Sequence, residues 1–221
     1  MMEHTNILRS NRHTCTELIA SAQQLVRSLA ERNILQALTR TRDCQQGNVS
    51  NEELEGDARN RSRSVVSLRD IQRVFSLFDF FADKMHVWES NSIPKDHSMA
   101  IVLSVMIVYY MRLDSESRLE FIEGIESKIS SDFLEGVGIE NVLKNAVDAI
   151  IKDTEVPAGI ALTEGLKENI FMTLVCSLSR TPLMIVGPPG SSKVSTTCMY
   201  LIFNRLFSAK QASYLVFRHC Q

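Results

Sequence analysis

The stretch LMIVGPPGSSKVSTT, at residues 183–197, contains residues whose types and spacing could bind phosphate. In a phosphate-binding loop of the form G-x-x-x-x-G-K-[ST], backbone N–H groups and a helix N-terminus surround the phosphates, and the lysine reaches the β- and γ-phosphates. Here an apolar run precedes a loop that has the first glycine and the lysine of this pattern at the expected spacing. The loop residues are Gly187, Pro188, Pro189, Gly190, Ser191, Ser192 and Lys193. They are the candidate site for the phosphates of ATP.

Two residues of this stretch depart from the pattern. Ser192 replaces the second glycine, which is a mild change if its backbone φ is negative. Val194 occupies the position of the Ser or Thr whose hydroxyl binds magnesium, and valine has no oxygen to offer. Gly-Pro-Pro-Gly is also typical of an ordinary surface turn. A turn would require neither the apolar run before it nor a lysine at this spacing, so the phosphate-loop interpretation is favoured.

The residues after the loop lack the groups that ATP hydrolysis needs. Phosphoryl transfer in P-loop proteins uses a carboxylate on a second strand to hold magnesium, together with a group that orients the attacking water. Residues 194–221 contain no Asp and no Glu. We therefore expect no catalytic residue and no metal ligand in this chain, and only weak or vestigial ATP binding.

Helices must position this loop, because apolar residues recur at three- and four-residue spacings over most of the chain. The helix that leads to the loop is predicted at residues 162–178. It ends at Thr181-Pro182, because proline cannot continue the hydrogen-bond ladder. The wholly apolar residues 183–186 predict a short strand of the kind that lies inside a parallel sheet. Further helices are predicted at residues 14–38, 65–85, 97–112, 118–129 and 139–152.

The predicted helix at residues 65–85 has clear signals for its start and for its buried face. Ser67 followed by Asp70 resembles a capping box, with Asp in place of the more usual Glu. Apolar side chains then recur in steps of three and four residues and predict one continuous apolar face. These side chains are Leu68, Ile71, Phe75, Phe78, Ala82 and Met85.

Residues 39–64, by contrast, are rich in charged and amide side chains and lack aromatic residues. Val49 and Leu54 are isolated aliphatic residues within this segment. Such a composition buries too little apolar surface to offset the entropy lost on ordering. It therefore predicts a mobile surface insertion.

Composition excludes several classes of protein. The 221 residues carry a net charge of −2, with no basic excess that would indicate a nucleic-acid partner. The most apolar run, at residues 99–111, is shorter than the about 20 residues that cross a bilayer, so no transmembrane segment is expected. The five cysteines include no C-x-x-C pair, which argues against zinc sites and disulfides. The first ten residues do not resemble a secretory signal, so a cytoplasmic location is expected.

Three stretches, in their order and separation, resemble one family. They are VVSLRDIQRVFSLFDFF, MAIVLSVMIVYYM and VPAGIALTEGLKENIFMTLVCSLSRTPLMIVGPPGSSK. Together they look like the mysterin-type giant AAA+ ATPases, the RING-finger E3 ubiquitin ligases linked to moyamoya disease. The resemblance implies a mainly α chain, in which a helical lid and linker precede the truncated start (helix, strand, P-loop) of an α/β AAA+ domain.

The resemblance also implies domain boundaries. Residues 1–96 would be the end of one AAA+ unit, comprising its helical lid with the insertion at 39–64. Residues 97–156 would be a helical linker, and residues 157–221 the truncated start of the next AAA+ unit. From Val194 onward the sequence no longer looks like the family, so a divergent tail is expected at 194–221. Truncation, alternative splicing or an error in the deduced gene structure would each produce such a tail.

The resemblance also assigns roles to individual residues. The arginine of the lid motif contacts the nucleotide of its own AAA+ unit in related rings, so Arg69 would be a sensor-like residue for ATP bound elsewhere. Without the resemblance, Arg69 is an ordinary exposed helix arginine. Ser192 becomes a family trait, whereas Val194 does not, because the family leads us to expect Ser or Thr there. Magnesium would then be bound only in an intact parent protein.

Two functions remain open at this point. In the first, the chain is part of an AAA+ ATP-binding and ATP-hydrolysing E3 ubiquitin-protein ligase, and is itself unable to hydrolyse ATP or transfer ubiquitin. Its partners would be neighbouring AAA+ units, and a ubiquitin-conjugating enzyme only through modules absent from these residues. In the second, it is a non-enzymatic helical scaffold derived from a truncated or alternatively spliced product. An independent small P-loop kinase or GTPase is disfavoured, because the loop of such proteins lies near the start of its domain.

Overall fold

The structure, a computed structural model, describes residues 12–45, 50–63, 65–84, 97–129, 133, 137–152 and 160–185. Over these ranges the chain is mainly α, as predicted, and contains seven α-helices and no strand. The helices are α2 (Arg12–Gln45), α3 (Asn51–Ser62), α4 (Leu68–Lys84), α5 (His97–Val108), α6 (Ser115–Glu126), α7 (Ile139–Lys152) and α8 (Glu164–Leu178), with a 3₁₀ turn, η2 (Tyr110–Arg112), between α5 and α6.

The described residues belong to two compact packing units. The first contains the described residues up to 84 and from 97 to 142, and the second contains those from 143 to 185. The first packing unit therefore joins residues on both sides of the expected boundary at residue 96. How residues pack into compact units does not show which AAA+ unit they belong to. The three segments expected at 1–96, 97–156 and 157–221 therefore stay predictions.

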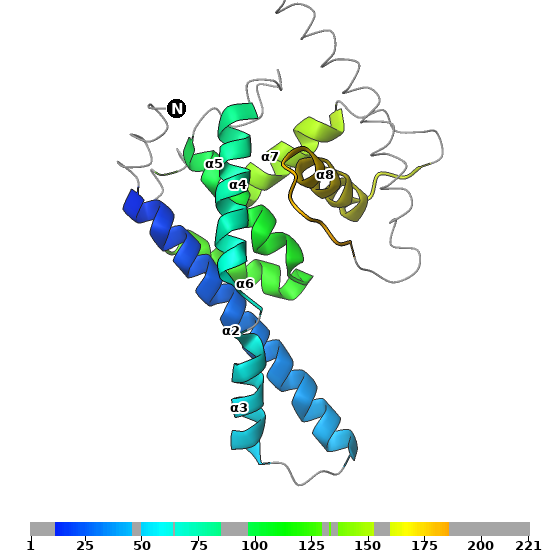
Figure 1. Cartoon of the computed structure of the whole chain (residues 1–221). Coiled ribbons are helices and arrows are strands. Elements are labelled where there is room, and N and C mark those ends of the chain that lie inside the picture. Colours follow the sequence, from blue (N-terminus) through cyan, green and yellow to red (C-terminus); the bar gives the residue numbers. More distant parts are fainter. Residues whose placement is uncertain are drawn as a thin grey trace, which may run out of the picture. The chain divides into compact units, whose positions relative to one another are not determined.

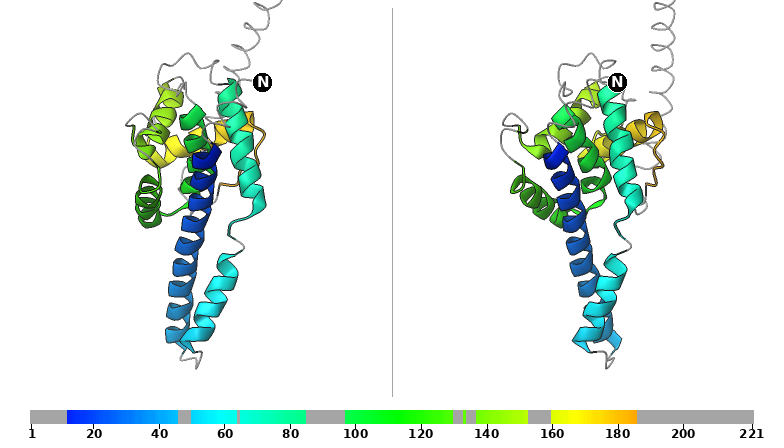
Figure 2. Two further views of the ribbon diagram at one scale, coloured as in Figure 1. Left: turned by 90° about the vertical axis from the view of Figure 1, so that its left-hand side faces the viewer. Right: turned by 60° about the vertical axis from the view of Figure 1, so that its left-hand side comes forward.

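The first packing unit is built around helices α2 and α5. The long α2 packs against α3, α5 and α6, while α4 packs against α5 (Figures 1 and 2). Helix α5 is buried on nearly every side, with Ile101, Leu103 and Met106 fully inaccessible to solvent. A helix that is apolar all round belongs in a core rather than on a surface. The prediction of a largely buried helix from residue 97 is therefore confirmed.

Helix α3 corrects the prediction for residues 39–64. Residues 39–45 extend α2, and residues 51–62 form α3 instead of a structureless insertion. Ser50 and Glu53 make a complete capping box, in which the Ser50 hydroxyl accepts from the Glu53 N–H and the Glu53 carboxylate accepts from the Ser50 N–H. Leu54 and Ala58, one turn apart, are buried on the helix that packs against α2. Two apolar side chains at helical spacing suffice because α2 supplies the rest of the interface.

Helix α4 is present where it was predicted, but its buried face is rotated. Leu68 and Phe75 were expected in the core and are instead 79% and 47% exposed. The face that packs on α5 is formed by Val74, Leu77, Phe78 and Phe81, with the buried Asp70 at its start. Apolar residues occur around most of α4, so spacing alone could not identify which arc faces the core.

The second packing unit contains a small core around α8. Leu166 and Ile170 are buried and contact the partly buried Ile151, Ile160 and Leu162. All are aliphatic, and Ile151 comes from the last turn of α7. The helix predicted at residues 162–178 is thus confirmed with a start at Glu164.

The predicted strand at residues 183–186 is not formed in the part of it that the structure describes. Residues 181–185 have no regular structure, and Met184 is 84% exposed. An inner strand of a parallel sheet needs paired strands on both edges and cover on both faces. The described part of the chain contains no other strand, so residues 183–185 have no such partners among the described residues.

Candidate functional site

Helix α8 and its C-terminal turn lead the chain toward the predicted phosphate loop. At its start, the Thr163 hydroxyl accepts a hydrogen bond from the Leu166 N–H at 3.3 Å. At its end, Arg180 adopts the left-handed conformation with φ 56°, and the Thr181 N–H donates to the Cys176 carbonyl at 2.8 Å. This 6→1 bond is the Schellman pattern, which ends a helix and redirects the chain. The predicted stop before Pro182 is confirmed.

The predicted loop itself lies outside the described residues. Its residues are Gly187, Pro188, Pro189, Gly190, Ser191, Ser192 and Lys193. Phosphate binding by these residues therefore stays a prediction. The described chain that leads to them, residues 181–185, has no regular secondary structure and is largely exposed.

Arg69, the predicted sensor-like residue, lies in the first turn of α4 and is exposed to solvent. Within the described residues it makes no ion pair or side-chain hydrogen bond. It belongs to the first packing unit, whereas the residues that lead to the loop belong to the second. Its role toward a nucleotide stays a prediction.

The neighbouring Asp70 makes the contacts that sequence reasoning largely missed. Its side chain is only 5% exposed, and its Oδ2 accepts a hydrogen bond from the Ser67 N–H at 2.8 Å. Its Oδ1 lies 3.4 Å from Arg73 Nη1 and 3.7 Å from Arg112 Nη1. The spacing of Ser67 and Asp70 predicted the first contact. No sequence signal pointed to Arg112, which lies 42 residues further along the chain.

Arg112 joins this carboxylate to a buried tyrosine. Its guanidinium carbon lies 5.2 Å from the centre of the Tyr109 ring, within the range of a cation–π contact. Burial lowers the pKa of the Arg112 guanidinium, although the nearby Asp70 carboxylate opposes this change. Burial also raises the pKa of the Tyr109 phenol, and the Gln23 amide partly offsets that rise. The Tyr109 hydroxyl is buried and makes no hydrogen bond of ordinary geometry in the described structure.

This Asp70–Arg112–Tyr109 cluster joins structural elements of the first packing unit. It links the first turn of α4 to the turn that follows α5, and it contains no nucleophile with an adjacent general base. In the described ranges, no group of three or more His, Cys, Asp or Glu side chains is arranged to hold a metal ion. The described residues therefore lead to the candidate site, whose own residues lie outside them.

Comparison with known proteins identifies sequences that are similar to this chain. Residues 159–221 match the family described as the RNF213 AAA domain. E3 ubiquitin-protein ligase rnf213-beta of Danio rerio is 30% identical over 136 residues, which are 59% of this chain and 3% of that protein. E3 ubiquitin-protein ligase RNF213 of Homo sapiens is 26% identical over 144 residues, again 59% of this chain and 3% of that protein. No solved structure matches significantly.

A protein of Dictyostelium discoideum described as an uncharacterized transmembrane protein is also similar, with 30% identity over 159 residues, or 60% of this chain and 3% of that protein. In the described part of the present chain, no helix is both long and apolar enough to cross a membrane. The chain spans about 3% of the length of each of these curated relatives.

The extent of the family match bears on one expectation. The matched residues, 159–221, include the phosphate loop and also residues 194–221. The expectation that the resemblance ends at Val194 is therefore not supported by this match. The recognition of the mysterin (RNF213) family from residues before Val194 is confirmed.

Proposed function

Because this chain is related to the RNF213 (mysterin) E3 ligases and carries an RNF213-type AAA segment, we propose that it binds the phosphates of ATP weakly through Gly187–Lys193 without hydrolysing ATP. The observation that supports this proposal is the match of residues 159–221 to the RNF213 AAA domain family, because that range includes the residues of the loop. Helix α8 and its Schellman turn precede the loop in the sequence, which is consistent with this proposal.

The loop's own residues set the limits of its activity. Backbone N–H groups and Lys193 supply contacts to phosphate oxygens, whereas Val194 offers no oxygen to magnesium. Residues 194–221 supply no carboxylate to hold the metal or orient water. A strand at residues 183–186 would complete the entry to the loop only when further strands pair with it.

The wider functions of the relatives belong to the rest of such a protein in this proposal. Neighbouring AAA+ units are the partners of this segment, and Arg69 of the lid senses nucleotide bound by residues outside this sequence. Ubiquitin transfer and contact with a ubiquitin-conjugating enzyme are assigned to other modules of the parent protein. Magnesium acts only in an intact parent, and the location is cytoplasmic.

Calorimetric titration of the chain with ATP, with and without magnesium, tests this proposal. We expect a dissociation constant of about 100 µM or weaker, the same with and without magnesium. The variant Lys193→Ala should lose the remaining binding, because it removes the one cationic phosphate contact of the loop. Micromolar, magnesium-dependent binding by the unaltered chain would contradict the proposal, as would binding that Lys193→Ala leaves unchanged.

A second candidate function, a non-enzymatic helical scaffold, is favoured by one observation. Large apolar side chains are exposed on the first packing unit, where Leu68 and Leu119 are 79% and 68% accessible. Exposed apolar groups mark interaction surfaces when they are joined by other recognition features. A scaffold would retain its partner when Lys193 is replaced, which separates this function from nucleotide binding.

A further inference from the structure

The buried carboxylate of Asp70 faces two arginines. Its Oδ1 lies 3.4 Å from Arg73 Nη1 and 3.7 Å from Arg112 Nη1, so one negative charge is shared by two positive charges. Elsewhere on the same packing unit an arginine pairs closely with a carboxylate, as Arg32 does with Glu120 at 2.6 Å. We call Arg73 and Arg112 the arginine pair. With Asp70 it carries an excess of one positive charge.

The guanidinium of Arg112 makes no hydrogen bond to any described residue, because its distance to Asp70 is too long for one. Its guanidinium carbon lies 5.2 Å from the centre of the Tyr109 ring. Such a contact uses the face of the guanidinium and leaves the N–H donors around its edge. The Arg112 side chain is 33% exposed, so a solute can reach these donors.

The neighbouring Arg118 has a similar ring contact but different hydrogen bonding. Its guanidinium carbon lies 4.9 Å from the centre of the Tyr110 ring. Its N–H groups donate to the carbonyls of Leu113 at 3.1 Å and Met111 at 3.4 Å. Partly buried donors in folded proteins normally have such acceptors. Arg112 therefore differs from Arg118 in that its donors have no acceptor within the described ranges.

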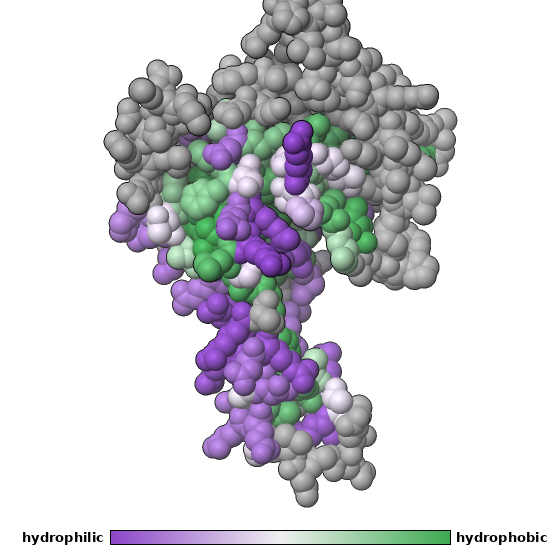
Figure 3. All heavy atoms as spheres, viewed as in Figure 1, coloured by the Kyte–Doolittle hydropathy of each residue, from purple (hydrophilic) through white to green (hydrophobic). Residues whose placement is uncertain are grey.

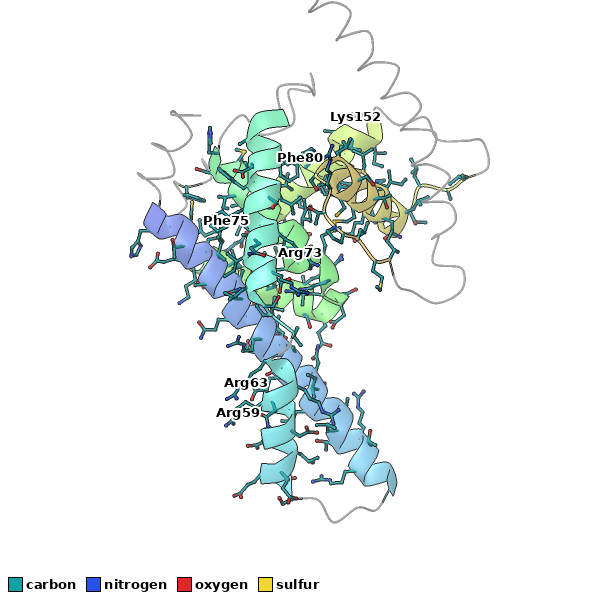
Figure 4. All side chains as sticks on the ribbon, viewed as in Figure 1. Arg59, Arg63, Arg73, Phe75, Phe80 and Lys152 are labelled. Carbon is teal, nitrogen blue, oxygen red and sulfur yellow. The ribbon has the colours of Figure 1, made fainter. Side chains whose placement is uncertain are left out.

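Arg73 supplies a second accessible guanidinium beside the first. It projects from α4 with its side chain 44% exposed (Figure 4), and Figure 3 shows hydrophilic surface over the N-terminal half of this helix. Its hydrogen bond to Asp70, at 3.4 Å, is long. Burial lowers the pKa of Arg112, and the like charge of Arg73 lowers it further, although Asp70 opposes both effects. The two guanidiniums therefore repel each other, and an anion bound to both would offset that repulsion.

We propose that the arginine pair binds a phosphate group. A guanidinium has five N–H donors, and Asp70 approaches only one nitrogen of each arginine, so most donors of the pair remain for a ligand. The planar fork of N–H groups matches the oxygens of a phosphate. A phosphate has several free oxygens and can accept from both guanidiniums at once, whereas Asp70 reaches both through a single oxygen at long distances.

This inference does not depend on nucleotide binding at the predicted loop, because the arginine pair includes neither Lys193 nor Arg69. Free phosphate and a phosphate ester present the same kind of oxygen to the pair. Two probes, inorganic phosphate and O-phosphoserine, separate these sources.

NMR titration of the full chain with inorganic phosphate, observed through the arginine Nε–H signals, tests the proposal. At low salt the signals of Arg73 and Arg112 should shift together and saturate with a dissociation constant of about 1–10 mM. The Arg118 signal should stay in place, because carbonyl groups already accept from its donors. Sodium chloride at matched ionic strength should leave all three signals unchanged. The same shifts with O-phosphoserine would show that the pair accepts esters, whereas shifts with inorganic phosphate alone would show that it accepts only the free ion.

Variants of the pair show whether both arginines bind the ligand. Arg73→Gln removes one charge, and Arg112→Lys keeps the charge beside Asp70 but removes the planar fork, so each should weaken phosphate binding at least about fivefold. Arg40→Gln, at an exposed position of α2, is the matched control, and Lys193→Ala separates this site from the loop; both should bind like the unaltered chain. The dispersion of the amide signals shows whether each variant is folded. Shifts that do not saturate, shifts that chloride reproduces, or unchanged affinity in both pair variants would each overturn the proposal.

Discussion

At the scale of single residues, Asp114 shows how one side chain sets the start of a helix. Its carboxylate accepts a hydrogen bond from the Ser117 N–H at 2.9 Å, at the N-terminus of α6. This bond, together with that from the Ser117 hydroxyl, lowers the pKa of the Asp114 carboxyl. A lowered pKa in the folded state means that the charged form stabilises the fold.

We predict that Asp114→Ala lowers the free energy of unfolding by about 1 kcal/mol at pH 7. The stabilisation is fully present above the unfolded-state pKa of about 3.9 and is lost as the pH falls through the lower folded-state pKa. Urea unfolding of the two proteins between pH 7 and pH 2.5 should therefore give curves that converge in acid. Asp114→Asn, which keeps an acceptor but no charge, is the control and should lose less stability than Asp114→Ala at pH 7. A difference that grows on acidification would contradict this prediction.

Arg180 occupies a position that normally suits glycine. Its φ of 56° lies in the left-handed region, which costs a residue with a Cβ about 1 kcal/mol or more. We predict that Arg180→Gly raises the free energy of unfolding by about 0.5–1 kcal/mol, measured by denaturant titration. Arg180→Ala, which keeps a Cβ, should give no such gain. Destabilisation by glycine would show that the Arg180 side chain makes a stabilising contact.

At the scale of elements, most helices could be predicted from the sequence, because apolar spacing and stop signals mark them locally. Helix α7 was predicted with its observed bounds, and α8 ends where Pro182 required. Helix α3 was missed because its composition alone suggests disorder. The Ser50–Glu53 capping box was nevertheless readable at its start.

Which face of a helix is buried depends on the helices that pack against it, and the spacing of apolar residues does not identify those helices. The apolar positions of α4 surround most of the helix, and contact with α5 selected Phe78 and Phe81 over Leu68 and Phe75. The contact of Asp70 with Arg112 has the same origin, because it joins residues that only the tertiary fold brings together. For the candidate site, the phosphate loop was predicted from sequence and stays a prediction, because its residues lie outside the described ones.

Helix α3 should depend strongly on its cap, because Leu54 and Ala58 provide most of its buried apolar surface. We predict that Ser50→Ala destabilises α3 by about 1 kcal/mol, which is about a fivefold increase in local opening. Hydrogen exchange of the amides of residues 54–58 should accelerate accordingly, while those of α5 stay unchanged. Ser28→Ala, which removes an exposed hydroxyl from α2, is the control. Equal exchange in Ser50→Ala and the unaltered chain would mean that packing on α2 alone maintains α3.

At the scale of the whole molecule, the described residues form two packing units that contain different features. The first contains the contacts among Asp70, Arg112 and Tyr109, and the second contains α8, which leads into the segment that matches the RNF213 AAA domain family. The chain corresponds to about 3% of the length of its curated relatives, so ubiquitin transfer is proposed only for the parent protein. In the proposed function, the present residues contribute a loop that has a lysine but no hydroxyl at the magnesium-binding position.

Restoring that ligand tests this central claim most directly. In a phosphate loop, Val194→Thr places a hydroxyl where magnesium is bound, so calorimetric titration should show ATP binding that magnesium strengthens at least about fivefold. The unaltered chain should bind ATP weakly and equally with and without magnesium. The control Thr197→Val changes a hydroxyl outside the loop pattern and should behave like the unaltered chain. Absence of any magnesium effect in Val194→Thr would contradict the assignment of Gly187–Lys193 as a phosphate loop.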